Sequence, residues 1–87
     1  IQAFPNPSHG KTAVRFRLSR DQAVKVEIFD PAGRAVRRIF DGALSPGTHS
    51  LPWDGRDDAG RETSAGIYLA RVSTSAEWRT TKLIRVR

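Results

Sequence analysis

The sequence predicts an all-β fold, a β-sandwich of about seven short antiparallel strands. Apolar and polar residues alternate in short runs, which is the pattern of strands with one buried face. Clusters of Gly, Pro, Asn and Asp interrupt these runs about every eight to twelve residues. No long stretch repeats apolar residues with the spacing of an amphipathic helix. Two sheets packed face to face would bury the alternating apolar residues and leave the charged ones in water.

The first part of the chain is expected to contribute three strands. Residues 1–4 are expected to form a short edge strand, and the prolines within residues 5–11 indicate a turn, because proline cannot donate to a β-ladder. Residues 12–18 and 24–28 alternate cleanly, so each is expected to be a strand with one face in the core. The residues of those inward faces are Val14, Phe16, Leu18, Val24, Val26 and Ile28.

The middle of the chain is less regular. Asp30-Pro31-Ala32-Gly33 has proline at the second position and glycine at the fourth, as type I turns prefer, which predicts a tight hairpin. Two adjacent arginines break the alternation of residues 34–40 and indicate a β-bulge. Residues 41–47 are expected to be a loop. Residues 48–53 are expected to be a strand whose proline favours an edge position.

The last part of the chain contains its most β-prone segment, residues 66–74. This segment is apolar on both faces at its start, which predicts a central strand. A hairpin loop at residues 73–77 is expected to lead into a final strand, residues 78–86. Tyr68, Ala70 and Val72 share one face of the central strand, and Ile67, Leu69 and Arg71 share the other. The final strand ends in the apolar residues Leu83, Ile84 and Val86.

Residues 53–60, Trp-Asp-Gly-Arg-Asp-Asp-Ala-Gly, carry the densest turn signal in the chain. Asp side chains favour turns because they accept hydrogen bonds from nearby backbone amides, and glycine tolerates positive φ. Trp53 shares a face with Leu51 and is expected to anchor the loop in the core. The sequence therefore predicts a structured connection between two strands, and its structural residues are Trp53, Asp54, Gly55, Asp58 and Gly60.

The composition suits one modest domain spanning residues 1–87, with 38% hydrophobic and 28% charged residues. Cysteine is absent, which excludes disulfides, thiol nucleophiles and zinc sites built on cysteine. No apolar run approaches the length of a membrane-spanning helix, and no signal peptide is visible. Because the chain begins at Ile1 rather than Met, we expect it to be part of a longer protein.

No residue pattern points to a metal, a cofactor or a catalytic centre. Asp54, Asp57 and Asp58 resemble calcium ligands in type, but their spacing lacks the alternating acids and closing Glu of calcium loops. We therefore interpret them as turn-capping residues. Around His9 and His49, no Ser, Asp or Glu has catalytic spacing. The prediction is a non-enzymatic domain without metal or cofactor.

The net charge of +6 allows attraction to nucleic acid, anionic polysaccharide or lipid headgroups but does not require it. The arginines are scattered over several strands among Asp and Glu, without any nucleic-acid-binding motif, so nucleic acid is not the expected partner. An anionic surface polysaccharide stays open as a partner. Trp78 follows a hairpin and is the better candidate for an exposed contact with a sugar, whereas Trp53 is expected in the core.

Four motifs resemble two families of bacterial immunoglobulin-like domains. Phe4-Pro5-Asn6-Pro7 resembles the "PNP" opening of such domains at the C-termini of secreted proteins, and residues 26–36 resemble the hairpin "V-x-I-Y-D-x-x-G-R-x-V", with Phe in place of the common Tyr. Residues 53–60 resemble the "W-D-G-x-D-x-x-G" loop of the Ig-like domain in flagellar hook-capping (FlgD) proteins. Residues 65–69 and 82–84 are similar to the "G-I-Y" and "K-L-I" endings of type A sorting domains of the type IX secretion system.

The resemblance implies an immunoglobulin-like β-sandwich that serves as a non-catalytic C-terminal module of a secreted or cell-surface bacterial protein. In a sorting domain, the secretion machinery would recognise the last strand. Ile84 is then expected to hold this strand to the sheet while Arg85 points to water. The alternatives are an architectural domain of a hook-capping or other extracellular assembly, which would contact neighbouring protein domains, and an accessory adhesion or glycan-binding module of a surface enzyme. The residues assigned to recognition are Lys82, Leu83, Ile84 and Arg85.

Overall fold

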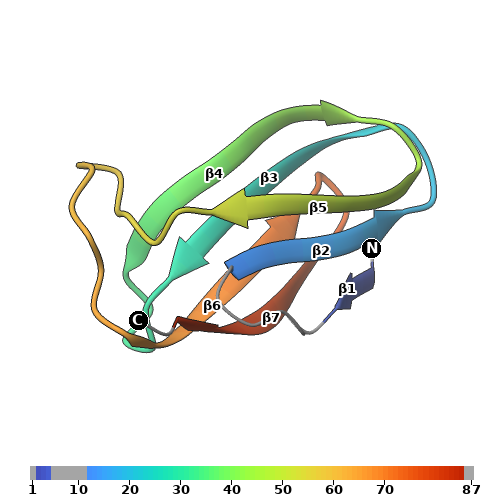
Figure 1. Ribbon diagram of the computed structural model, residues 1–87. Helices are drawn as coiled ribbons and strands as arrows, with labels where there is room; N and C mark the ends of the chain where they lie inside the picture. The colour runs from blue at the N-terminus through green and yellow to red at the C-terminus, as the bar shows by residue number, and fades with distance from the viewer. Residues whose placement is uncertain (1, 5–11, 86–87) are drawn as a thin grey trace.

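Two antiparallel sheets packed face to face make up the computed structural model, which describes residues 2–4 and 12–85 (Figure 1). The predicted all-β sandwich is confirmed. The smaller sheet has the strand order β1-β2-β5, and the larger sheet has the order β4-β3-β6-β7. The turn predicted at residues 5–11, with His9, and the end of the last strand at Val86 lie outside the described residues. The described strands are β1 (Gln2–Phe4), β2 (Thr12–Leu18), β3 (Gln22–Phe29), β4 (Ala35–Leu44), β5 (Gly47–Trp53), β6 (Gly66–Ser73) and β7 (Trp78–Arg85).

The core lies between the two sheets and consists of the inward faces that the alternation predicts. Strands β2, β3 and β6 each contribute three buried apolar side chains, and β5 and β7 contribute one each. Burying one large apolar side chain stabilises a fold by about 1.5–3 kcal/mol, so these faces account for most of the packing energy. The buried residues are Val14, Phe16, Leu18, Val24, Val26, Ile28, Trp53, Tyr68, Ala70, Val72 and Leu83.

Strand β4 contains the predicted bulge. Val26 pairs with Phe40, but the next residue of β3, Glu27, pairs with Arg38, so Ile39 is an extra residue in the ladder. Because of this shift, Ile39 and Phe40 both pack against the core although they are adjacent in the sequence.

The prediction of a loop at residues 41–47 is wrong for most of that segment. Strand β4 continues to Leu44, which pairs with Gln22, and residues 45 and 46 alone connect β4 to β5. The aspartate and glycine that begin this segment are weak strand formers. Pairing along the whole of β3 overrides that local preference, because β-propensity depends strongly on the neighbouring strand.

The hairpin predicted at residues 30–33 is confirmed. The Gly33 amide donates a hydrogen bond to the Asp30 carbonyl (3.0 Å), and the Arg34 amide donates to Asp30 Oδ1 (2.9 Å). The Arg34 amide is also the main reason that the pKa of Asp30 lies below its ordinary value. Gly33 adopts a φ of +88°, a conformation that favours glycine.

The positions of β5 and β6 in their sheets agree with the sequence. Strand β5 is an edge strand, as its proline predicts, and β6 lies between β3 and β7 as a central strand. The outer face of β6 is nevertheless open, since Ile67 and Leu69 are 49% and 37% exposed. Within the described ranges, no helix is long and apolar enough to cross a membrane.

Candidate functional site

Trp53 and Tyr68 hold the two ends of the long connection between β5 and β6. Trp53 is 4% exposed, and its ring meets the Tyr68 ring edge to face at a centroid distance of 5.1 Å. The indole N–H donates a hydrogen bond to the Arg56 carbonyl (2.9 Å), and the Tyr68 hydroxyl donates to the Ser64 carbonyl (2.7 Å). The connection is therefore tied to the core at both ends.

Asp54 closes the first turn of this connection. Its Oδ1 accepts a hydrogen bond from the Arg56 amide (2.9 Å) and lies 3.2 Å from Nη1 of Arg37 on β4. The Arg56 amide first, and the Arg37 charge after it, hold the pKa of Asp54 below its ordinary value. The Arg56 side chain in turn donates to the Gly60 carbonyl (2.9 Å), and Gly60 adopts a φ of +83°.

Asp57 and Asp58 also bind backbone amides. Asp57 Oδ1 accepts a hydrogen bond from the Arg61 amide (2.9 Å), within the same loop. Asp58 attaches the loop to β4, because its Oδ1 accepts from the Arg38 amide (3.1 Å) and its own amide donates to the Val36 carbonyl (3.0 Å). The Asp57 bond is the one expected of a turn-capping carboxylate, whereas the Asp58 carboxylate binds a strand instead of its own turn. Among residues 2–4 and 12–85, no group of three or more acidic or His side chains could hold a metal ion.

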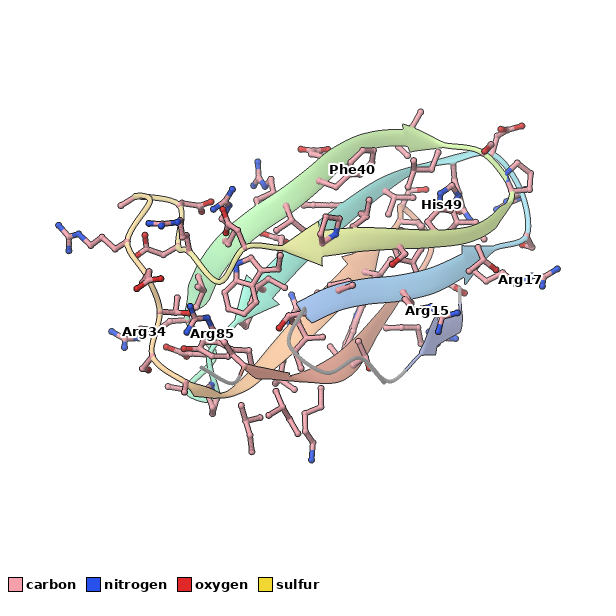
Figure 2. The ribbon with its side chains drawn as sticks, viewed as in Figure 1. Arg15, Arg17, Arg34, Phe40, His49 and Arg85 are labelled. Atoms are coloured by element: carbon pink, nitrogen blue, oxygen red, sulfur yellow. The ribbon has the colours of Figure 1, made fainter. Side chains whose placement is uncertain are left out.

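The structure brings Arg85 of β7 to the same loop. Gly55 is buried with a φ of +79°, and a Cβ at this position would overlap the Arg85 guanidinium. The Arg85 side chain is 15% exposed, and its Nη2 lies 4.0 Å from Glu62 Oε1. Figure 2 shows Arg85 at the end of the sandwich where this loop lies. The Arg85 side chain lies on the inward side of β7 and reaches the loop. The prediction that it points to water is therefore wrong.

The prediction that Ile84 holds β7 to the sheet is wrong as well. Leu83 is fully buried and pairs with Tyr68, whereas Ile84 is 58% exposed and pairs with Ile67. Leu83 therefore holds β7 to the core, and Ile84 does not. Lys82 is exposed on the same outer face as Ile84. A shift of one residue exchanges the two faces of a strand, and that shift separates the expected orientation from the observed one.

A groove of about 750 Å³ lies between the β3–β4 turn and residues 57–68. Its acidic side chains are Asp30, Asp57 and Asp58. Each of these carboxylates accepts a hydrogen bond from a backbone amide. The carboxylates that line the groove therefore stabilise the backbone around it through these hydrogen bonds.

His49 packs as a structural residue on β5. Its ring stacks on Phe16 with the centroids 5.6 Å apart, and its Nε2 lies 2.7 Å from the Ser45 carbonyl oxygen. Figure 2 shows His49 near the β4–β5 connection, at the opposite end of the sandwich from Arg85. It is thus far from the loop carboxylates.

One cluster on the outer face of the larger sheet was missed by the sequence reasoning. The Arg71 guanidinium lies over the Phe29 ring (4.7 Å to the centroid) and over the Trp78 ring (5.1 Å). Trp78 is 58% exposed, in agreement with its expected position. The alternation of β6 places Arg71 outward, but only strand pairing brings the two aromatic rings to it.

Comparison with known proteins identifies the domain type. Residues 5–77 match the family described as the FlgD Ig-like domain. The crystal structure of FlgD from P. aeruginosa is similar with a TM-score of 0.65 and 24% sequence identity over 85% of this chain, which supports the fold. This chain spans 60% of that FlgD chain. No curated protein shows significant similarity.

These findings confirm the part of the resemblance that concerns hook-capping Ig-like domains. The matching family is not that of type A sorting domains, so the resemblance to sorting domains stays a prediction. The match covers the loop at residues 53–60 and five strands in full, β2 to β6. The chain belongs to the FlgD Ig-like domain family.

Proposed function

We propose that this domain is a non-catalytic architectural module of an exported bacterial assembly, of the kind found in flagellar hook-capping proteins. The observation that carries the proposal is the FlgD Ig-like family match over residues 5–77. The hydrogen bonding of the loop supports it, because the three loop carboxylates accept hydrogen bonds from backbone amides and so stabilise the loop structure. A sandwich with its longest connection tied to the core suits a rigid element that positions neighbouring domains.

A domain exchange tests this role. We expect a hook-capping protein whose own Ig-like domain is replaced by residues 1–87 to restore hook formation and swimming, relative to a variant that lacks the Ig-like domain. Hook length by electron microscopy and swimming speed are the measurements. An unrelated β-sandwich of similar size, inserted at the same place, is the control. A folded, exported chimaera that performs no better than this control contradicts the proposal.

A second role, sorting by a type IX secretion machine, is favoured by one feature of β7. This strand is an edge of the larger sheet, and its Lys82 and Ile84 are exposed, so a partner can reach both. Leu83 and Arg85 face inward and would support the strand without contacting the secretion machinery directly.

A reporter fusion separates the two roles. In a bacterium with a type IX system, we expect a periplasmic reporter fused to this domain to stay in the periplasm, because the architectural role requires no sorting. Fractionation and reporter activity are the measurements. Release of the reporter by the native domain, lost in a folded Lys82→Glu/Ile84→Ser variant, would replace the architectural proposal with sorting. These substitutions lie on the exposed face, so they test recognition without removing a core residue.

A further inference from the structure

The outer face of the larger sheet is apolar where β6 and β7 lie side by side. Strand pairing places Ile67 opposite Ile84, and Leu69 opposite Lys82. In the described part of the chain, the large hydrophobic side chains that are exposed are Ile67, Leu69, Trp78 and Ile84, and all of them belong to this face. Exposed apolar residues scattered singly are ordinary, but apolar residues gathered on one face mark an interaction surface.

Arg71 lies within this apolar surface in an arrangement that favours an anion. Its guanidinium lies over the rings of Phe29 and Trp78, which fix its position by cation–π contact. Its Nε is buried and has no hydrogen-bond partner among the described residues. Because the buried Nε is out of a partner's reach, a carboxylate would bind the terminal Nη atoms, and the planar guanidinium can donate two parallel hydrogen bonds to it. A carboxylate from a partner would therefore meet a cation that is already positioned.

We propose that the β6–β7 face is a docking surface for a polypeptide segment that combines apolar and acidic side chains. The aliphatic side chains would bury the apolar residues of the segment, while Arg71 and Lys82 would bind its carboxylates. Trp and Arg are the side chains that most often anchor protein interfaces, and both are present here. The β6–β7 face comprises Ile67, Leu69, Arg71, Trp78, Lys82 and Ile84.

Charge and side-chain type favour this occupant over two others. A second copy of the chain would bring Arg71 and Lys82 against the same cations, and each copy carries a net charge of +6. An anionic polysaccharide would match the charge, but sugars stack on open aromatic rings. Most of the exposed apolar side chains here are aliphatic, and the Trp78 ring already has the Arg71 guanidinium over it. This docking role goes beyond the architectural function and does not depend on hook assembly.

An NMR titration of the isolated 87-residue chain tests the proposal. The probe is a short synthetic peptide that alternates leucine and glutamate. Two further peptides replace its glutamates by glutamine or by lysine. We expect the glutamate peptide to shift the amide signals of β6 and β7, to bind more tightly than the glutamine peptide, and to lose affinity as salt screens the charges. The lysine peptide is expected not to bind.

Matched variants locate the site. Arg71→Gln and Ile84→Ser are each expected to weaken binding of the glutamate peptide by about tenfold, as loss of one interface anchor does. The control is Arg17→Gln, the same chemical change on the exposed side of β2 in the other sheet (Figure 2). It is expected to change the dissociation constant by less than about twofold, because a charge outside the interface acts only through screened attraction. Ile84→Ser removes an exposed side chain and is expected to leave the fold intact.

Each other outcome overturns the proposal. Equal binding of the glutamate and glutamine peptides would remove the role of Arg71, and signal shifts on the smaller sheet would place the site elsewhere. Concentration-dependent shifts of β6 and β7 without peptide would make a second copy the occupant. Shifts of the same residues by an acidic oligosaccharide, but not by the glutamate peptide, would make the face a glycan site. Binding of none of these probes would exclude a docking surface of this chemistry.

Discussion

Trp53→Ala is expected to lower the free energy of unfolding by about 3–5 kcal/mol, the cost of removing a large aromatic side chain from a packed core. Trp53 is 4% exposed, packs edge to face on Tyr68 and donates a hydrogen bond to the Arg56 carbonyl. The substitution therefore creates a cavity and also releases one end of the β5–β6 connection. Urea denaturation followed by circular dichroism measures the change.

The second tryptophan provides the matched control. Trp78 is 58% exposed on the outer face of the larger sheet, so Trp78→Ala is expected to cost less than about 1 kcal/mol, most of it from the lost contact with Arg71. Equal losses from the two substitutions would mean that Trp53 does not anchor the core.

Alternation predicts much of this fold because the side-chain period of a strand is two and one face is buried. In β2, β3 and β6, apolar residues occupy every second position, and the structure buries those positions. The expected turn at residues 30–33 and the bulge before Phe40 follow from local chemistry, since proline, glycine and adjacent arginines carry that information in the sequence.

The remaining features depend on contacts between distant residues. The contact of Gly55 with Arg85 and the hydrogen bond from the Arg38 amide to Asp58 join segments that have no local pattern in common. Strand β4 extends to Leu44 only because β3 supplies a partner for each of its residues there. The Arg71 cluster likewise depends on the pairing of β6 with both of its neighbours. Periodicity within one strand contains none of this information.

Strand β7 shows most clearly that contacts between distant residues decide the orientation of a strand. Leu83 and Ile84 are adjacent and both apolar, so alternation alone cannot decide which of them faces the core. Pairing with β6 decides it, because Leu83 pairs with Tyr68 on the buried side and Ile84 pairs with Ile67 on the exposed side.

Leu83→Ala is accordingly expected to lower the free energy of unfolding by about 2–5 kcal/mol, as other buried Leu-to-Ala substitutions do. Ile84→Ala, one residue further along β7, is expected to cost less than about 1 kcal/mol, since it removes an exposed side chain and a modest strand preference. Thermal and urea denaturation of both variants measure the difference. A larger loss for Ile84→Ala would mean that β7 pairs with β6 in the register that puts Ile84 inside. That result would also bury Lys82 and the apolar part of the β6–β7 face, so the same pair of variants tests the orientation on which the docking surface depends.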